Sequence, residues 1–298
     1  MKKNVISVLL IILLIQFIKV TPIYAEDFEN IIQFELISDS DDLKSILDCN
    51  SVIANIVNQQ ITKANNAKNY GRDYPLLDSN ELNFSTNPDI YCIRSRDIYN
   101  TDIYNASIND IKEKAKFEFW YVQYLKEDVM YMFKLYNHQP VMESSSGYFK
   151  ISDSWYLDDF RVEFLGNIEF SSDYRLYPKN VIENMNRLLP ETDRKSKIKL
   201  IKARLNIYNN DCYIVCVDNN AKYVYCETYR LLSHFHSDED YTDDATEEDK
   251  ENINHLRKML YNNFYSDSHE IKKLYSYNMI VFITSYVYSK IDNIHEYD

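Results

Sequence analysis

Glycine is scarce in this chain. Only Gly71, Gly147 and Gly166 occur among its 298 residues, whereas an average usage of ~7% would give roughly 20. Glycine lets a backbone wrap around a phosphate or make the tight turn of a nucleophile elbow. The glycine-rich motifs of nucleotide-binding loops and of α/β-hydrolases are missing from the sequence. The composition therefore argues against nucleotide-dependent enzymes and against α/β-hydrolases.

A long uninterrupted apolar segment is missing as well. The N-terminal apolar run, 5–18, is interrupted by Ser7 and Gln16 and is shorter than the ~18–20 residues of a spanning helix. Two lysines precede this run, and a Thr-Pro-Ile-Tyr-Ala segment that ends at Ala25 follows it. That order is typical of a secretory signal peptide. We expect residues 1–25 to be cleaved and the mature chain to be secreted, with possible attachment to the cell envelope and no transmembrane segment.

Positive charge is in short supply. The chain has 33 Lys and Arg against 46 Asp and Glu, which gives a net charge of −13. The expected signal peptide contains three lysines and no acidic residue, so its removal would bring the net charge to −16. Phosphate backbones and anionic lipid surfaces repel so acidic a protein. We therefore exclude nucleic acid as a partner and expect a protein or glycan partner outside the cell.

The five cysteines match no zinc-binding pattern, and their odd number allows at most two disulfides. Cys212 and Cys216 would share one face of a strand, too far apart to bond. Cys226 can face Cys212 across a hairpin only if the loop holds an odd number of residues. The alternative is that these cysteines are small buried apolar residues. The 27 tyrosines suit β-strands and a recognition surface, or they reflect AT-rich codon usage.

Hydrophobic periodicity predicts an α+β protein with two modules, each an antiparallel β-meander packed against helices. The N-terminal module is expected over 26–165 and the C-terminal module over 166–298. The elements predicted for the first are strand 32–36, helix 43–65, strand 90–94, helix 107–114, hairpin 117–136, and strands 148–151 and 160–165. Those predicted for the second are helix 178–189, strands 201–207, 213–217 and 222–229, helix 246–262, and strands 271–274 and 279–288.

Two stretches carry a resemblance to known proteins. The run Phe119-Trp120-Tyr121-Val122, followed by the segment 147–151, resembles uncharacterised secreted proteins of low-GC Gram-positive bacteria. The segment 180–229, a helix and then YIVCVDNNAKYVY, is similar in outline to PepSY-like modules, although the PepSY glycine at the hairpin is missing. The resemblance implies a non-catalytic extracytoplasmic module and assigns no functional residue.

The sharpest candidate metal site consists of His234, His236, Asp238 and Asp240. On a strand, both imidazoles would face one side and could hold Zn²⁺ or another transition metal with the carboxylates, or the carboxylates alone could hold Ca²⁺. Neither an HExxH motif nor EF-hand spacing accompanies them. The alternative is a solvated acidic linker whose charges favour the start of the next helix. We expect either a divalent metal or no cofactor.

Two further sets of candidate catalytic residues have weaker support in the sequence. A cysteine nucleophile would need Cys49 or Cys92 to meet His138, and neither cysteine lies in a known nucleophile motif. A glycosidase needs two carboxylates at a suitable separation. The best such acids are Asp158, Asp159 and Glu163, which lie near Trp155 and Tyr156 in the sequence. The alternative is that the two aromatic residues pack at the end of a sheet and the acids lie in a loop.

The sequence leaves two classes of function. The first hypothesis is a secreted, non-enzymatic binding or interaction protein, because catalytic motifs are missing and the predicted strands are rich in aromatic residues. The alternative is a metal-dependent extracellular hydrolase that uses the His/Asp/Glu cluster within 234–251.

Overall fold

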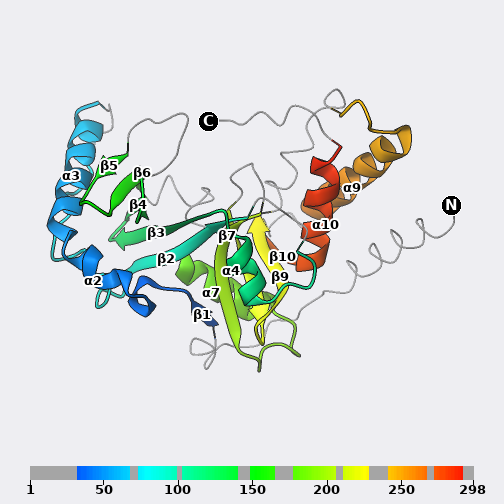
Figure 1. Cartoon of the computed structure of the whole chain (residues 1–298), viewed down its shortest axis with the longest axis horizontal. Helices are drawn as coiled ribbons and strands as arrows, with labels where there is room; N and C mark the ends of the chain where they lie inside the picture. Colours follow the sequence, from blue (N-terminus) through cyan, green and yellow to red (C-terminus); the bar gives the residue numbers. More distant parts are fainter. Residues whose placement is uncertain are drawn as a thin grey trace.

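A computed structural model of the chain describes residues 32–67, 73–98, 103–139, 148–164, 177–205, 211–227, 241–266 and 272–290. Within these residues, ten strands form one sheet, and helices cover both of its faces (Figure 1). The strand order is β10-β9-β8-β7-β2-β3-β4-β6-β5, with β1 paired to β7. The chain is therefore a mixed α+β protein.

The N-terminal half of the sheet is antiparallel, with β6 between β4 and β5. Its strands are β2 (Ile90–Asp97), β3 (Phe117–Lys126), β4 (Val129–Tyr136), β5 (Phe149–Lys150) and β6 (Tyr156–Phe164). Every one of them overlaps a strand that the sequence predicts. The β3–β4 hairpin turns at Glu127, which adopts a φ of 56°. β2 is longer than its predicted apolar part because its charged end, residues 94–97, pairs with residues 117–120 of β3.

The C-terminal half is also antiparallel. Its strands are β7 (Ile198–Arg204), β8 (Asp211–Val217), β9 (Asn220–Glu227) and β10 (Lys272–Ser276), and each pairs antiparallel with the next in this order. The β8–β9 turn places Asp218 and Asn219 at φ values of 50° and 71°, in the left-handed region that short polar residues tolerate and tight hairpins require. The predicted helix-then-meander order is confirmed for this half.

The two halves meet through parallel pairing. Residues 95–97 of β2 pair with residues 202–204 of β7, and β1 (Ile32–Phe34) pairs with residues 198–200 of the same strand. Just after β1, the backbone N–H of Arg94 donates to the carbonyl of Glu35 at 2.9 Å. β1 therefore lies between β2 and β7 at the end where these two strands no longer pair with each other. The division into two modules stays a prediction, because its boundary at 165/166 lies outside the described residues.

The helices follow the amphipathic patterns of the sequence. The 3₁₀ turn η1 (Ile37–Asp39), α2 (Asp42–Leu47) and α3 (Asn50–Ala67) lie at one end of the sheet, and α4 (Ile108–Lys114), α9 (Glu247–Ser266) and α10 (Tyr277–Tyr288) pack toward the other (Figure 1). On the opposite face, α7 (Pro178–Leu188) packs through Val181 and Met185. Pro178 stands at the start of α7, as predicted. Thr246 and Asp249 form the predicted capping pair of α9.

Two elements were predicted wrongly. The expected single helix 43–65 is divided into α2 and α3 by a turn at residues 48–49. Residues 279–288, expected to be a strand, belong to the helix α10. A continuous apolar run of this kind has no strict alternation, and its periodicity cannot separate a buried strand from a buried helix. Met279, Ile280, Val281 and Ile283 are buried in the core cluster that joins α10 to β8 and β9. None of the helices in the described ranges has both the length and the hydropathy that a membrane crossing requires.

Candidate functional site

The candidate site lies at the charged end of β2. Because side chains alternate along a strand, Arg94 and Arg96 point to one face of the sheet. Trp120 stands opposite Arg94 on β3, and Glu118 stands opposite Arg96. Glu35, from the segment that follows β1, reaches the same place. Three segments that are distant in sequence therefore bring charged side chains together on one face.

These charges form a connected network that we call the arginine–glutamate network: Glu35, Arg94, Arg96, Lys112 and Glu118. Arg96 donates from both terminal nitrogens to the two carboxylate oxygens of Glu35, at 2.7 and 2.9 Å, and from Nε to Glu118 at 2.6 Å. Arg94 donates to the other oxygen of Glu118 at 2.8 Å. Lys112 on α4 lies 3.8 Å from Glu35. Such bidentate, charge-assisted contacts fix both distance and orientation.

The members of the network differ in how deeply they are buried. The side chain of Arg96 is 1% exposed and that of Glu35 is 13% exposed, whereas Arg94 and Glu118 are each about one-third exposed. Burial alone would raise the pKa of the Glu35 carboxyl, but the hydrogen bond and the charge of Arg96, with Lys112 and Arg94, lower that pKa overall. Glu35 and Glu118 likewise raise the pKa of Arg96 against the effect of its burial. The inner part of the network therefore stays ionised near neutral pH.

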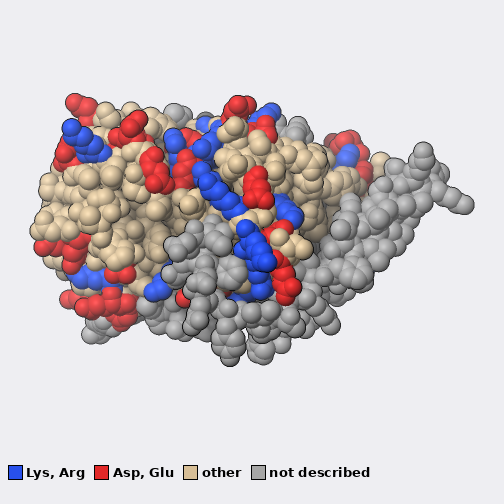
Figure 2. Space-filling view, turned by 90° about the horizontal axis from the view of Figure 1, so that it is seen from below, with Lys and Arg blue, Asp and Glu red and all other residues tan. Residues whose placement is uncertain are grey.

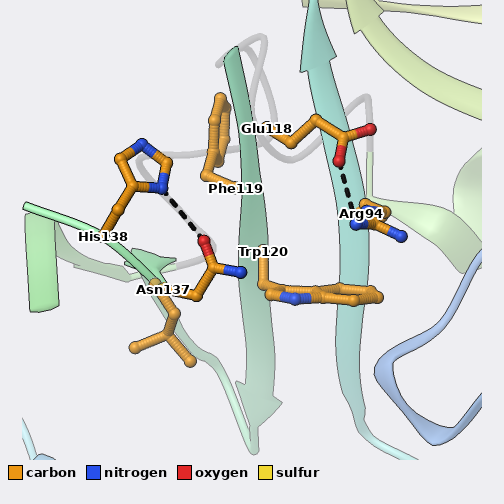
Figure 3. Close-up of a pocket in the computed structure, with 7 residues that line it drawn as sticks. Arg94, Glu118, Phe119, Trp120, Asn137 and His138 are labelled. Atoms are coloured by element: carbon orange, nitrogen blue, oxygen red, sulfur yellow. Dashed lines mark hydrogen bonds and ion pairs between the residues drawn. The ribbon is translucent and has the colours of Figure 1, made fainter. Parts of the chain in front are cut away.

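A cavity of about 210 Å³ opens beside the exposed side of this network. Its lining residues are Arg94, Glu118, Phe119, Trp120, Leu135, Asn137 and His138. In Figure 3, Asn137 and His138 lie on one side of the opening, and Glu118 and Arg94 lie across from them. Asn137 and His138 immediately follow β4 and are exposed. The side-chain oxygen of Asn137 lies 2.9 Å from Nδ1 of His138.

The floor of the cavity is apolar. Trp120, Phe119 and Leu135 are buried, and the guanidinium of Arg94 stacks over the Trp120 ring at 5.4 Å from its centre. The indole N–H of Trp120 donates to Asp42 on α2 at 3.1 Å. Trp120 is therefore held by α2 on one side and supports Arg94 on the other. The result is a polar rim of fixed geometry around an apolar floor, as in small-ligand sites.

A second charged group lies on the opposite face of the same strands. This buried ion cluster consists of Asp97, Lys134, Lys202, Arg204 and Asp211. Lys202 and Arg204 both donate to Asp211, at 3.0 and 3.2 Å, and the Lys202 ammonium lies 4.4 Å from the centre of the Tyr121 ring. Burial alone would raise the pKa of Asp211, but Lys202 and Arg204 hold it well below its usual range. Such a cluster fixes the register where β2 meets β7, and a buried ion pair is costly to disrupt.

The outer surface carries charges of both signs. Figure 2 shows Lys and Arg side chains gathered near the middle of one face, with Asp and Glu side chains between them. The arginine–glutamate network has three cations and two carboxylates, although the whole chain has a net charge of −13. The candidate site is therefore a local exception to the acidic character of the protein.

The predicted metal ligands His234, His236, Asp238 and Asp240 lie outside the described residues. The described part of the chain contains no group of three or more His, Cys, Asp or Glu residues that could hold a metal. Asp249, at the end of the acidic segment, accepts hydrogen bonds from the Thr246 backbone N–H and from the Tyr286 hydroxyl, at 2.9 and 2.7 Å. These bonds, Tyr286 first, lower the pKa of Asp249 to about 2. This carboxylate serves as a helix cap.

Trp155 and Cys92, one from each of the other two candidate catalytic sets, take structural positions, whereas His138 lies at the rim of the cavity. Trp155 is buried, and its indole N–H donates to Ser45 on α2 at 3.2 Å, so it packs between the sheet and a helix. Cys92 is buried beneath α2 and α3. Burial, with a contribution from Asp42, raises the pKa of its thiol well above the ordinary value, whereas a cysteine nucleophile needs a lowered pKa.

Sequence reasoning missed the arginine–glutamate network. A signal was present, because Arg94 and Arg96 alternate with Ile93 and Ser95 at the end of an apolar strand. Two cations on the same face of a central strand need carboxylate partners from neighbouring strands. Their partners Glu35 and Glu118 lie far away in sequence, which hid the pairing.

Comparisons with protein-family models, with curated proteins and with solved structures give no match to this chain.

Proposed function

We propose that this chain is a secreted, non-enzymatic binding protein whose cavity beside Trp120 takes one sugar ring of a neutral glycan. The observation that carries the proposal is the lining of the cavity. Arg94, Asn137 and His138 can donate hydrogen bonds, and Glu118 can accept them. A sugar hydroxyl both donates and accepts, and the C–H face of the ring is apolar like the cavity floor.

The size and the charge of the cavity support the same ligand class. A volume of about 210 Å³ is smaller than the ~300–1,000 Å³ of sites for drug-sized molecules, so it suits a single ring rather than an extended molecule. The two exposed charges at the rim, Arg94 and Glu118, already neutralise each other at 2.8 Å. A neutral ligand can add hydrogen bonds to this pair without separating it, whereas a charged ligand would have to compete with it.

The same arrangement favours binding over turnover. Hydrolysis of a glycoside uses two carboxylates, one of which must exchange a proton. Glu118 is the single carboxylate among the cavity-lining residues, and its two oxygens accept from Arg94 and Arg96. The cavity lining therefore lacks the second carboxylate that glycoside hydrolysis uses.

The test is titration of the mature chain, residues 26–298, with glucose, galactose, mannose and N-acetylglucosamine and with their β-linked oligosaccharides. Asn137→Ala and His138→Ala remove exposed rim groups and should leave folding intact. Each lost hydrogen bond should weaken binding roughly 3–10-fold, which corresponds to ~0.5–1.5 kcal/mol. His255→Ala, which changes an exposed histidine on α9, is the matched control and should leave the affinity unchanged.

Two results would overturn the proposal. One is that no sugar in the panel binds at millimolar concentration. The other is that a sugar binds equally well to Asn137→Ala, His138→Ala and the control, because the ligand would then lie elsewhere. Turnover of an oligosaccharide during the titration would replace the binding function by an enzymatic one.

A further inference from the structure

Two cysteines face each other across the β8–β9 hairpin. Tyr213 pairs with Tyr225, so the next position outward brings Cys212 opposite Cys226. The register shift between Val215 and Cys216 supplies the odd residue that this pairing needs. Both thiols are buried in the core cluster formed by β7–β9, α4, α9 and α10.

We propose that Cys212 and Cys226 form a cross-strand disulfide when the chain folds in an oxidising compartment. Residues directly opposite each other on antiparallel strands have Cα atoms about 4.5–5.5 Å apart, within the ~4.4–6.8 Å range of disulfides. The inference is independent of the proposed glycan site, which lies on β2–β4, and it assigns a chemical modification to a hairpin that the binding function does not use.

The other three cysteines are excluded by position. Cys216 lies four residues from Cys212 on the same strand, which corresponds to ~13 Å and is beyond the reach of a disulfide. Cys49 and Cys92 belong to a different core cluster, beneath α2 and α3. The structure therefore offers Cys212 a single partner among the described residues.

The surroundings of the pair indicate when the bond forms. Burial, with smaller contributions from Cys226 and Asp211, raises the pKa of the Cys212 thiol well above its ordinary value. The thiolate is the attacking species in disulfide exchange, so the folded and reduced protein should react very slowly. Oxidation therefore belongs to the folding phase, when the hairpin exists but α9 and α10 have not yet covered it.

The reaction is a thiol–disulfide exchange with an external disulfide, for which we choose oxidised glutathione. The Cys226 or Cys212 thiolate attacks the glutathione disulfide and releases one glutathione thiol. The second cysteine then attacks the mixed disulfide and releases the other. The two protein thiols are oxidised by two electrons, and one glutathione disulfide is reduced to two thiols.

The experiment refolds the mature chain from urea with oxidised and reduced glutathione, then alkylates the free thiols in denaturant and weighs the product. Since the described structure holds five free cysteines, the proposal expects three alkyl groups after oxidative refolding and five after refolding in reductant. Cys212→Ala and Cys226→Ala should each show four alkyl groups. Cys216→Ala, the matched control on the same strand face, should show two.

Thermal unfolding gives a second readout. The bond would close a segment of 15 residues from Cys212 to Cys226, and its reduction should lower Tm by roughly 5–10 °C. This difference should vanish in Cys212→Ala and persist in Cys216→Ala. Five alkylated thiols after oxidative refolding, or a disulfide that peptide mapping places on any other pair, would overturn the proposal.

Discussion

The buried contact between Glu35 and Arg96 gives the sharpest stability prediction. Glu35→Gln removes the charge that accepts both terminal nitrogens of Arg96, at 2.7 and 2.9 Å. Arg96 is 1% exposed, so the guanidinium cannot turn to water for compensation. Arg96→Met removes the cation but keeps an apolar side chain of similar length. The double variant removes both charges together.

The expected magnitudes follow from burial. Removal of one partner from a buried ion pair costs about 3–5 kcal/mol, while replacement of both by apolar groups is often close to neutral. Glu118 still accepts from Nε of Arg96 at 2.6 Å, so we expect Glu35→Gln to destabilise the fold by about 3 kcal/mol. The double variant should lose about 2 kcal/mol less than the sum of the single variants, within the usual range for contacting residues.

Urea unfolding followed by the fluorescence of Trp120 and Trp155, the two tryptophans of the chain, measures these differences. Both indoles are buried, so unfolding exposes them. Lys150→Ala is the control, because Lys150 forms an ion pair with Asp153 on the exposed surface, and it should leave the urea midpoint unchanged. Strictly additive losses for Glu35→Gln and Arg96→Met would refute the reasoning, since they would mean that the pair is not energetically coupled.

Two more predictions concern pH and metal. The folded pKa of Glu35 lies below its ordinary value of 4.5, so its stabilisation is present above pH 4.5 and is lost as the pH falls through the folded pKa. The urea midpoints of wild type and Glu35→Gln should therefore approach each other as the pH falls below 4.5, and a constant gap would contradict this assignment. We expect Zn²⁺ and EDTA to leave Tm unchanged, because the acidic segment before α9 has neither an HExxH motif nor EF-hand spacing. A metal at 100 Kd would add ~2.7 kcal/mol, so a rise of several degrees that disappears in the His234→Ala, His236→Ala double variant would establish the metal site.

The sequence predicted elements that depend on local patterns. Helix α7 follows from Pro178 and its apolar stripe, and the start of α9 follows from Thr246 and Asp249, whose cap forms as predicted. The β3–β4 and β8–β9 hairpins follow from alternation and from polar turns such as Asp218-Asn219. In each case the information lies within a few residues, so tertiary contacts did not need to be known.

The features that define the candidate site depend on contacts between distant segments. Arg96 and Glu35 are 61 residues apart, and the parallel pairing of β2 with β7 joins the two halves of the chain. The hydrophobic pattern of a single strand shows neither the parallel register of β2 with β7 nor the position of β1 beside β7. The helix α10 was mistaken for a strand for the same reason: Ile280 and Val281 favour strands locally, but their burial against β8 and β9 settles the conformation.

The difference between local and distant contacts also predicts the order in which the β8–β9 hairpin and the arginine–glutamate network form during folding. The β8–β9 hairpin closes over a two-residue turn, so Cys212 and Cys226 can meet early, since short loops close quickly. The arginine–glutamate network needs β1, β2 and β3 together, and such non-local pairing forms slowly. Oxidation of the hairpin would precede closure of the sheet centre, and reduction of the disulfide should therefore lower the stability of the C-terminal half while the cavity beside Trp120 keeps its geometry.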